Sequence, residues 1–147
     1  MKKLIMALTS FTIAIFTAQA QTADETAIKT VIETETQAWH EGNTQKQISC
    51  WNIQPYSKSL ISLENGQLIH ITEADAKNAP PQTQGDGGLS SHNNYQIKVN
   101  GNMAFVNFDE VTTAKEGAKR YSREMRVLEK INGAWKIVAV SAHFYKP

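Results

Sequence analysis

The sequence contains a single cysteine, Cys50, and four histidines. One thiol cannot form an internal disulfide, so the hydrophobic core has to supply the stability of the folded chain. A lone cysteine is typical of a small buried apolar side chain, and a reactive nucleophile is the alternative. The histidines show no spacing typical of metal ligands, such as His-x-Glu or His-x-x-x-His, and zinc requires three or four convergent ligands. We therefore expect no metal site.

Neither sign of charge dominates the chain, which has 15 basic and 14 acidic side chains. This balance gives no electrostatic surface for nucleic acid and no polybasic patch for a membrane. The sequence also lacks a nucleophile elbow and a Cys-x-x-Cys motif. Residues 85–88 are rich in glycine, but they lack the flanking strand and helix that a phosphate-binding loop requires. We expect no nucleic-acid partner and no cofactor.

Long apolar runs are scarce, and the only one covers residues 4–16. Two lysines precede this run, and Ala-Gln-Ala at residues 18–20 has the small-x-small pattern of a cleavage site. The pattern predicts a secretory signal over residues 1–20 that is cleaved before Gln21, with an uncleaved anchor as the alternative. We expect an exported protein, in the periplasm or outside the cell, with no membrane contact after cleavage.

Residues 21–147 are long enough for one domain, with helices first and strands last. Helical spacing of apolar residues predicts a first helix that ends before Gly42, and a short second helix that begins at Asn43 or Thr44 and ends by Pro55. One stripe of the first helix faces a core; its members are Ile28, Val31, Ile32, Ala38 and Trp39, with Glu35 as the polar exception.

Alternating patterns follow the helices. Residues 59–63 and 67–71 flank Asn65-Gly66, which is a strong hairpin signal. A short helix begins at Thr72, and residues 80–92 form a loop over the surface or a rim over a pocket. Residues 94–99, 103–113, 120–131 and 134–145 are predicted strands joined by tight turns. The fold class is therefore α+β, with the helices packed in the concave face of a strongly curved antiparallel sheet that encloses a pocket.

Three passages resemble a known family when they are taken together in this order. They are Ala-Trp-His-Glu-Gly-Asn at residues 38–43, Ala-Phe-Val-Asn-Phe at residues 104–108, and the hairpin over residues 126–138 that contains Gly-Ala-Trp-Lys-Ile-Val. The chain resembles the nuclear transport factor 2-like superfamily, especially the secreted, SnoaL-like branch related to polyketide cyclases and ketosteroid isomerases. The likeness covers nearly all of residues 24–145.

The resemblance implies a cystatin-like cone or roll and a homodimer formed through the outer face of the sheet. It does not imply a reaction, because the superfamily includes isomerases, cyclases, dehydratases and transport adaptors. Ketosteroid isomerases use a tyrosine and carboxylates, and no set of residues here matches theirs. By the family's usual habit, polar groups on the concave face of the sheet line the pocket, which makes Ser141 and His143 pocket candidates.

Two residues are candidates for acid–base catalysis. Asp109 shares a strand face with Met103, Phe105 and Asn107, where partial desolvation would suit a general base. His143 is the best functional histidine, as an acid, a base or a hydrogen-bond donor. The alternative for Asp109 is a carboxylate at a strand end that is either solvated or paired with Arg123 or Arg126. The strand pattern alone leaves open which face lines the pocket.

Bulky aromatic side chains supply candidate walls for the pocket, and each has a place in the core as its alternative. The predicted ligand-binding residues are Trp39, Trp51, Tyr56, Tyr95, Phe105, Asn107 and Ser141. Three functions stay open: a module that binds a small apolar or amphipathic molecule, a small acid–base enzyme of the isomerase, cyclase or dehydratase kind, and a dimeric module that binds a partner.

Overall fold

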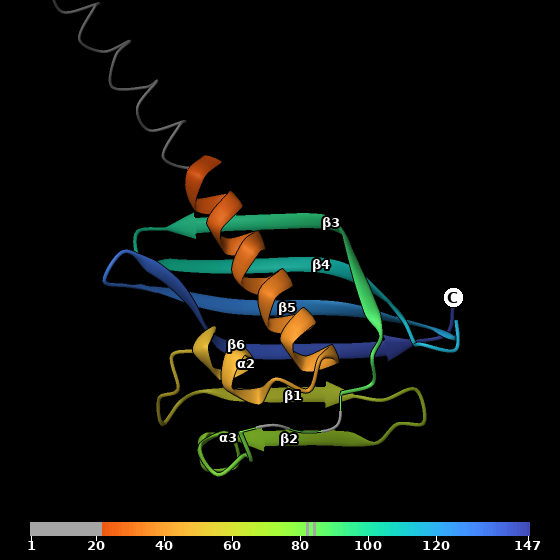
Figure 1. Cartoon of the computed structure of the whole chain (residues 1–147). Helices are drawn as coiled ribbons and strands as arrows, with labels where there is room; N and C mark the ends of the chain where they lie inside the picture. Colours follow the sequence, from red (N-terminus) through yellow and green to blue (C-terminus); the bar gives the residue numbers. More distant parts are fainter. Residues whose placement is uncertain (1–21, 82, 84) are drawn as a thin grey trace, which may run out of the picture.

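The computed structural model describes residues 22–81, 83 and 85–147 (Figure 1). The predicted secretory signal and the domain boundary at Gln21 lie outside these residues. Within the described part of the chain, no helix combines the length and the apolar composition needed to cross a membrane. A long N-terminal helix leads into a six-stranded sheet with the strand order β2-β1-β6-β5-β4-β3.

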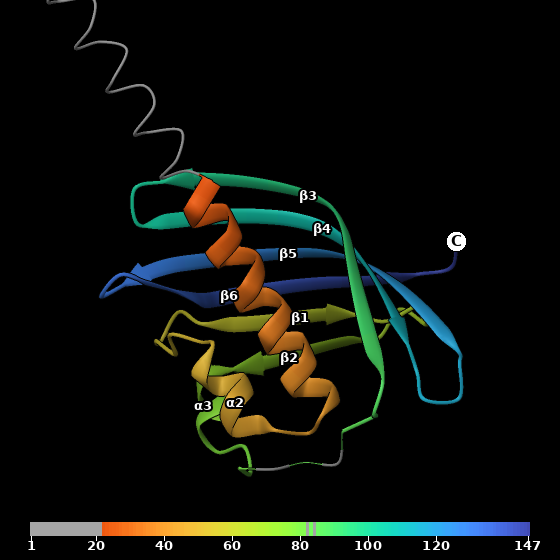
Figure 2. The same cartoon turned by 45° about the horizontal axis from the view of Figure 1, so that its top comes forward.

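The N-terminal helix occupies residues 22–40 and lies diagonally across one face of the sheet (Figures 1 and 2). Gly42 follows it with a φ of +70°, which is the left-handed conformation typical of a helix end. Asn43 then caps α2 (Thr44–Ser49), because its side chain accepts a hydrogen bond of 2.9 Å from the Lys46 amide. Both helices therefore match the sequence prediction.

The predicted hairpin and its following helix are also confirmed. β1 (Lys58–Ser62) and β2 (Leu68–Thr72) pair antiparallel around the turn that contains Gly66. Thr72 caps α3 (Glu73–Lys77) in a capping box with Asp75, whose carboxylate accepts from the Thr72 amide at 2.8 Å. This short helix directly follows β2, which is the edge strand on that side of the sheet.

Four long strands complete the domain: β3 (Leu89–Asn100), β4 (Met103–Thr113), β5 (Lys119–Ile131) and β6 (Ala134–Tyr145). They form an antiparallel meander, as predicted. β3 begins at Leu89 rather than at Asn94, because the polar residues that precede Asn94 pair with β4 across a register shift. The sheet is mixed, since β1 lies parallel to β6, and the sequence pattern did not indicate this crossover.

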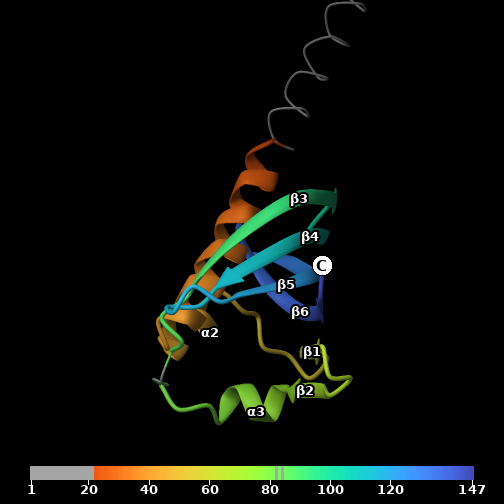
Figure 3. The ribbon, with the colours of Figure 1, turned by 90° about the vertical axis from the view of Figure 1, so that its right-hand side faces the viewer.

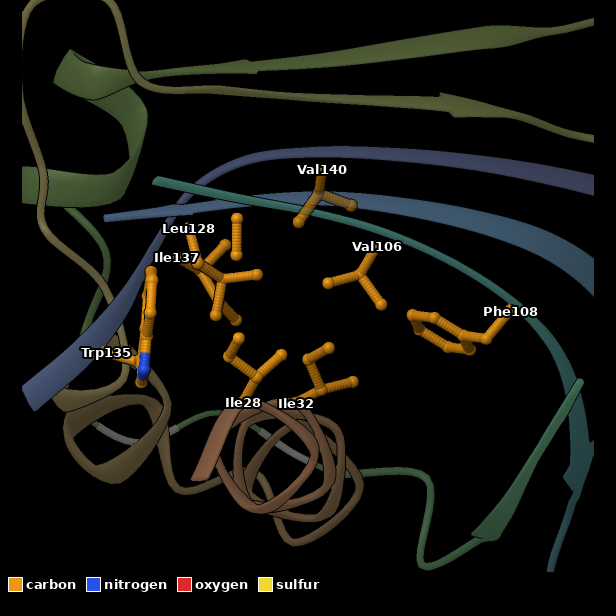
Figure 4. Packing of buried hydrophobic residues seen from close by; sticks show 9 residues of the cluster. Ile28, Ile32, Val106, Phe108, Leu128, Trp135, Ile137 and Val140 are labelled. Atoms are coloured by element: carbon orange, nitrogen blue, oxygen red, sulfur yellow. The ribbon is translucent and has the colours of Figure 1, made fainter. Parts of the chain in front are cut away.

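The sheet curls around the N-terminal helix, and α3 lies beneath the end where helix and sheet diverge (Figure 3). Ile28 and Ile32 of the helix are fully buried and point at the strands (Figure 4). They pack against one cluster of buried strand residues: Ala104, Val106, Phe108, Leu128, Trp135, Ile137 and Val140. This cluster fills only part of the concave face, so the rest of that face is left to line a cavity.

Candidate functional site

A cavity of about 370 Å³ lies between the N-terminal helix, α2, α3 and the concave face of the sheet. Apolar side chains form one part of its lining, to which α3 contributes Ala76, and the charged side chains of Lys58, Glu73, Asp75 and Arg120 also line it. The apolar lining residues are Trp39, Ile48, Trp51, Ile53, Ile61, Ile71, Ala76, Ala79, Val140, Ala142 and Phe144. The volume is within the usual range for a site that holds a small molecule.

Charged side chains form one side of this cavity, which we call the charged floor: Glu35, Glu110, Glu124 and Arg126. Each of the four is more than nine-tenths buried. Buried charges are tolerated when they are paired and hydrogen-bonded. Three carboxyl groups around one guanidinium group give the floor an excess of acidic groups.

Arg126 is the centre of the charged floor. Its Nη1 donates to Glu124 Oε2 at 2.5 Å, and its Nη2 lies 4.0 Å from Glu35 Oε2. Burial alone would lower the pKa of Arg126, but the three neighbouring carboxylates outweigh burial and raise it. The guanidinium group also lies over the Phe108 ring, with 5.5 Å between Cζ and the ring centroid. Arg126 is therefore a fixed positive charge.

Glu35 enters the floor from the helix. Its Oε1 accepts hydrogen bonds from Gln47 Nε2 at 2.8 Å and from Trp51 Nε1 at 3.3 Å. These contacts tie the helix to α2 and to the segment that follows α2. The polar exception in the apolar stripe of the first helix thus has a structural reason, because its carboxylate faces Arg126 and the cavity.

Glu110 and Glu124 have opposite pKa shifts although both are buried. Burial raises the pKa of Glu124, and the nearby Glu110 charge adds to this effect against the opposing charge of Arg126. Burial alone would also raise the pKa of Glu110, but the hydrogen bond and charge of His92, together with Arg126 and Ser90, lower it. The floor therefore places an ionised carboxylate beside a carboxyl group that holds its proton more tightly.

A chain of hydrogen bonds connects Glu110 to the surface. Asp86 Oδ1 lies 2.6 Å from His40 Nδ1, and His40 Nε2 lies 2.9 Å from Ser90 Oγ. The Ser90 hydroxyl donates to Glu110 Oε1 at 2.9 Å, and His92 Nε2 lies 2.9 Å from Glu110 Oε2. The Asp-His-Ser order is that of a hydrolase triad. Here the serine proton is directed to Glu110, so the imidazole is not its acceptor.

Backbone contacts hold the segment before β3 against the end of the N-terminal helix. The Thr83 amide donates to the Gly42 carbonyl oxygen at 2.9 Å, and the Gly87 amide donates to the His40 carbonyl oxygen at 3.0 Å. Thr83 also lines the cavity. Within the predicted loop over residues 80–92, Thr83 thus lies at the cavity, whereas residues 89–92 belong to β3.

Comparisons with known proteins found similarity only at the level of structure, since neither the protein-family models nor the curated proteins gave a match. An NTF-2-like (nuclear transport factor 2-like) protein of unknown function from Shewanella oneidensis MR-1 has a TM-score of 0.61 and 16% identity over 82% of this chain and 98% of that chain. A protein of unknown function with a cystatin-like fold, from Nostoc punctiforme, has a TM-score of 0.62 and 11% identity over 83% and 91%.

This chain has the nuclear transport factor 2-like fold. The resemblance found in the sequence is thereby confirmed at the level of the fold. The association domain of CaMKII from C. elegans is also similar, with a TM-score of 0.60 and 20% identity over 84% of this chain and 97% of that chain. The structures similar to this chain thus include an association domain as well as proteins of unknown function.

The two candidate catalytic residues lie on the outer face of this nuclear transport factor 2-like sheet, away from the cavity. Asp109 is 38% exposed and lies 4.0 Å from Arg123, which matches the solvated alternative for this residue. His143 is exposed and contacts Ser141, with 2.9 Å between Nε2 and Oγ. Asn107 shares the outer face. We expected four residues to lie in the cavity, and none of them lines it: Asn107, Asp109, Ser141 and His143.

A β-bulge explains the correction on β6. Trp135 and Ile137 point into the core, and the alternation of side chains would carry Ser141 and His143 inward as well. Val138 has no partner in the β5–β6 register, where Val127 pairs with Ala139 and Leu128 with Ile137. The extra residue switches the face, so Val140 and Ala142 line the cavity instead.

The aromatic candidates divide between the cavity and other sites. Trp39 and Trp51 line the cavity. Phe105 is 43% exposed on the outer face, because Ala104 and Val106 supply the inward side chains of β4. Tyr56 is exposed and donates to Glu129 at 3.0 Å, and Tyr95 packs against the core beside Phe108. Neither tyrosine is among the lining residues.

Cys50 is buried, and burial raises the pKa of its thiol, which matches a small structural side chain. Among the described residues, no group of three or more His, Cys, Asp or Glu side chains is placed to hold a metal ion.

The sequence did not predict the residues of the charged floor as part of the candidate site. Glu35 was visible as a charge within an apolar helical stripe, and such a charge indicates a buried polar site.

Proposed function

We propose that this protein binds a small amphipathic molecule in the cavity of its nuclear transport factor 2-like domain. The observation that carries the proposal is the division of one cavity into an apolar wall and a charged floor. Burial of an apolar ligand body against Trp39, Trp51 and Ile71 supplies affinity, and the polar floor fixes orientation. A binding role needs no assembled catalytic set, which agrees with the position of Asp109 and His143 outside the cavity.

A ligand screen tests this proposal. A compound that binds only the folded state raises the unfolding temperature of the purified protein. The matched variants are Ala76→Trp, which places an indole at the cavity rim, and Ala74→Trp, on the exposed side of the same helix α3. We expect Ala76→Trp to abolish the shift given by a hit and Ala74→Trp to retain it. Hits that shift both variants equally would contradict binding in the cavity.

We also propose that the protein is exported through the signal over residues 1–20. The apolar run, the preceding lysines and the Ala-Gln-Ala site support this proposal. Expression of the full chain in a bacterial host, followed by intact mass measurement of the periplasmic fraction, tests it. The expected mass is that of a chain beginning at Gln21. A full-length protein that remains in the membrane fraction would contradict cleavage.

Acid–base catalysis is a second candidate, favoured by the opposite pKa shifts of Glu110 and Glu124 in one floor. Glu110, whose pKa is lowered, is the group suited to accept the α-proton of a bound ketone, and Glu124, whose pKa is raised, is the group suited to donate to the carbonyl oxygen. Deuterium exchange into the methyl group of 2-acetylnaphthalene, followed by NMR in D₂O, measures this step. Catalysed exchange that is lost in Glu124→Gln but kept in Glu129→Gln, on the outer face, would support it. Exchange at the background rate would exclude it for this ketone.

We propose that the outer face of the sheet forms a homodimer. Met103, Phe105 and Ile131 expose large apolar side chains on this face, at 46, 43 and 41% of their surface. Exposed apolar patches of this kind mark interaction surfaces. Light scattering after size-exclusion chromatography should give twice the monomer mass, and Phe105→Asp should give the monomer mass. A parent protein that runs as a monomer at high concentration would contradict the dimer.

A further inference from the structure

One carboxylate oxygen of the charged floor, Glu35 Oε2, has no hydrogen bond from any described residue. Its partner oxygen Oε1 accepts from Gln47 and Trp51, and the ion-pair partner of Oε2, Arg126 Nη2, lies 4.0 Å away. That distance is too long for a hydrogen bond. The Glu35 side chain is 8% exposed and lines the cavity. Because buried carboxylate oxygens normally have donors, the cavity offers an unused acceptor.

This oxygen is accessible from the cavity. Among the described residues, three buried side-chain polar atoms have no hydrogen-bond partner and less than 1 Å² of accessible surface: Thr36 Oγ1, Tyr95 Oη and Arg126 Nε. Glu35 Oε2 also lacks a hydrogen bond but is not one of these atoms, so it keeps accessible surface. Glu35 lines this cavity and does not line the second hollow, which lies between the helix and β3. A ligand in the cavity therefore reaches Glu35 Oε2.

The other two carboxyl groups of the floor have a hydrogen-bond contact on each oxygen. Glu124 accepts from Ser122 on Oε1 and from Arg126 on Oε2. Glu110 accepts from Ser90 and Thr112 on Oε1, and its Oε2 lies 2.9 Å from His92 Nε2. Glu35 is therefore the carboxyl group of the charged floor to which a ligand donor adds a hydrogen bond without displacing another.

The charges around this oxygen favour a cation. The cavity is lined by five acidic and three basic side chains: Glu35, Glu73, Asp75, Glu110, Glu124, Lys58, Arg120 and Arg126. Three of the acidic side chains are buried, whereas Arg126 is the only buried basic one, since Lys58 and Arg120 are exposed. Arg126 Nη1 donates to Glu124 at 2.5 Å, so its guanidinium group is held closer to Glu124 than to Glu35. Glu35 thus lacks a hydrogen-bonded counter-ion.

The charged residues near the entrance have partners outside the lining. Arg120 pairs with Asp86 at 3.4 Å, and its Cζ lies 5.7 Å from the centroid of the Phe144 ring. Glu73 pairs with Lys77 on the next turn of α3. An anionic ligand therefore has to compete with Asp86 for Arg120 or to pair with the exposed Lys58, at the solvent side of the cavity.

We propose that the polar end of the ligand is a protonated amine, which donates a hydrogen bond to Glu35 Oε2. This inference rests on the proposed binding function and names the class of ligand. A charge-assisted hydrogen bond to a carboxylate is stronger than a neutral one, and aromatic rings such as those of Trp39 and Trp51 attract ammonium groups. Amines with a compact apolar body belong to this class.

Four naphthalene compounds of similar shape test the head group: 1-(2-naphthyl)ethylammonium, 1-(2-naphthyl)ethanol, 2-acetylnaphthalene and 2-naphthoate. Titration calorimetry at neutral pH measures their affinities for the parent protein. We expect the ammonium compound to bind at least tenfold more tightly than each of the other three, while the ketone still binds through its apolar body. Equal or tighter binding of the alcohol, the ketone or the naphthoate would overturn the amine and leave the binding function intact. If none of the four binds, the proposed binding function itself is contradicted.

Glu35→Gln removes the negative charge while keeping the shape of the side chain, and it tests the position of the head group. The variant should lose at least tenfold in affinity for the ammonium compound and keep its affinity for 2-acetylnaphthalene. Glu33 lies on the same helix, is exposed, and lines the second hollow but not the cavity. Glu33→Gln is therefore the control and should bind the ammonium compound like the parent. An unchanged ammonium affinity in Glu35→Gln, or an equal loss in Glu33→Gln, would overturn the assignment.

Discussion

Arg126 and Glu124 lie two residues apart on β5, and both side chains point into the concave face, where Arg126 Nη1 donates to Glu124 Oε2. Residues two apart on a strand share a face, so the pair is fixed by the backbone as well as by its hydrogen bond. The neighbours Arg123 and Met125 lie on the outer face. This relationship provides matched variants on one strand that differ only in the face they occupy.

Arg126→Met should reduce the free energy of unfolding by about 3 kcal/mol, because it leaves the carboxylates of Glu35 and Glu124 buried without their counter-ion. Arg123→Met is the control, since Arg123 is 77% exposed. It should change stability by less than about 0.5 kcal/mol. Urea denaturation followed by tryptophan fluorescence measures both variants. Equal effects in the two would show that the charged floor does not contribute to stability.

Glu110→Gln should lower stability by about 2 kcal/mol at neutral pH, because the variant loses a charged acceptor for His92 and Ser90. The folded-state pKa of Glu110 lies below the ordinary value of 4.5. Its contribution is therefore present above about pH 4.5 and is lost as the pH falls through the lower, folded-state value. Urea denaturation at a series of pH values should show the difference between parent and variant shrinking with acid. A difference that stays constant would contradict this assignment.

Gly42→Ala tests the contact between the helix end and the segment before β3. A Cβ at Gly42 would lie 2.1 Å from the Thr83 carbonyl oxygen, whereas a Cβ at Gly66 meets nothing within 4 Å. Both glycines have positive φ, so the strain of alanine in that conformation is common to both variants. Gly42→Ala should therefore cost about 1–3 kcal/mol more than Gly66→Ala in thermal or urea unfolding. Equal costs would mean that this contact is loose in solution.

His40→Leu should release the segment before β3, because His40 is fully buried and its two ring nitrogens contact Asp86 and Ser90. The expected cost is about 2 kcal/mol, because the partly buried Ser90 hydroxyl and the Asp86 carboxylate lose their partner. Hydrogen exchange at the Gly87 and Gly88 amides should become faster by at least tenfold relative to β5 amides. Unchanged protection of these two amides would show that the imidazole does not hold the segment.

Local sequence signals predicted most of the fold. Gly42, Asn43, the Asn65-Gly66 turn and the Thr72 cap each act through a few neighbouring residues, and each stands where the structure has it. The parallel pairing of β1 with β6 joins segments far apart in the chain, so no local pattern encodes it. The early start of β3 depends likewise on cross-strand pairing with β4.

The candidate site was harder to predict because it depends on which face of each strand is concave. A single bulge at Val138 changes which side chains of β6 point inward. On β4, apolar residues occupy both faces, so the sequence pattern does not indicate which face is concave. Glu35 was the informative residue, since a charge in a buried helical stripe requires partners. Those partners are Gln47, Trp51 and Arg126. Arg126 comes from a strand whose alternation alone did not distinguish its two faces.

The most direct test of the account is an NMR measurement of where 2-acetylnaphthalene binds. Nuclear Overhauser effects from its aromatic protons should reach the methyl groups of Ile71, Val140 and Ala142, which line the cavity. They should not reach Val127 or Ile131, which lie on the outer face of the sheet. Contacts with the outer-face methyl groups, or none with the cavity methyl groups, would contradict a ligand site inside the domain.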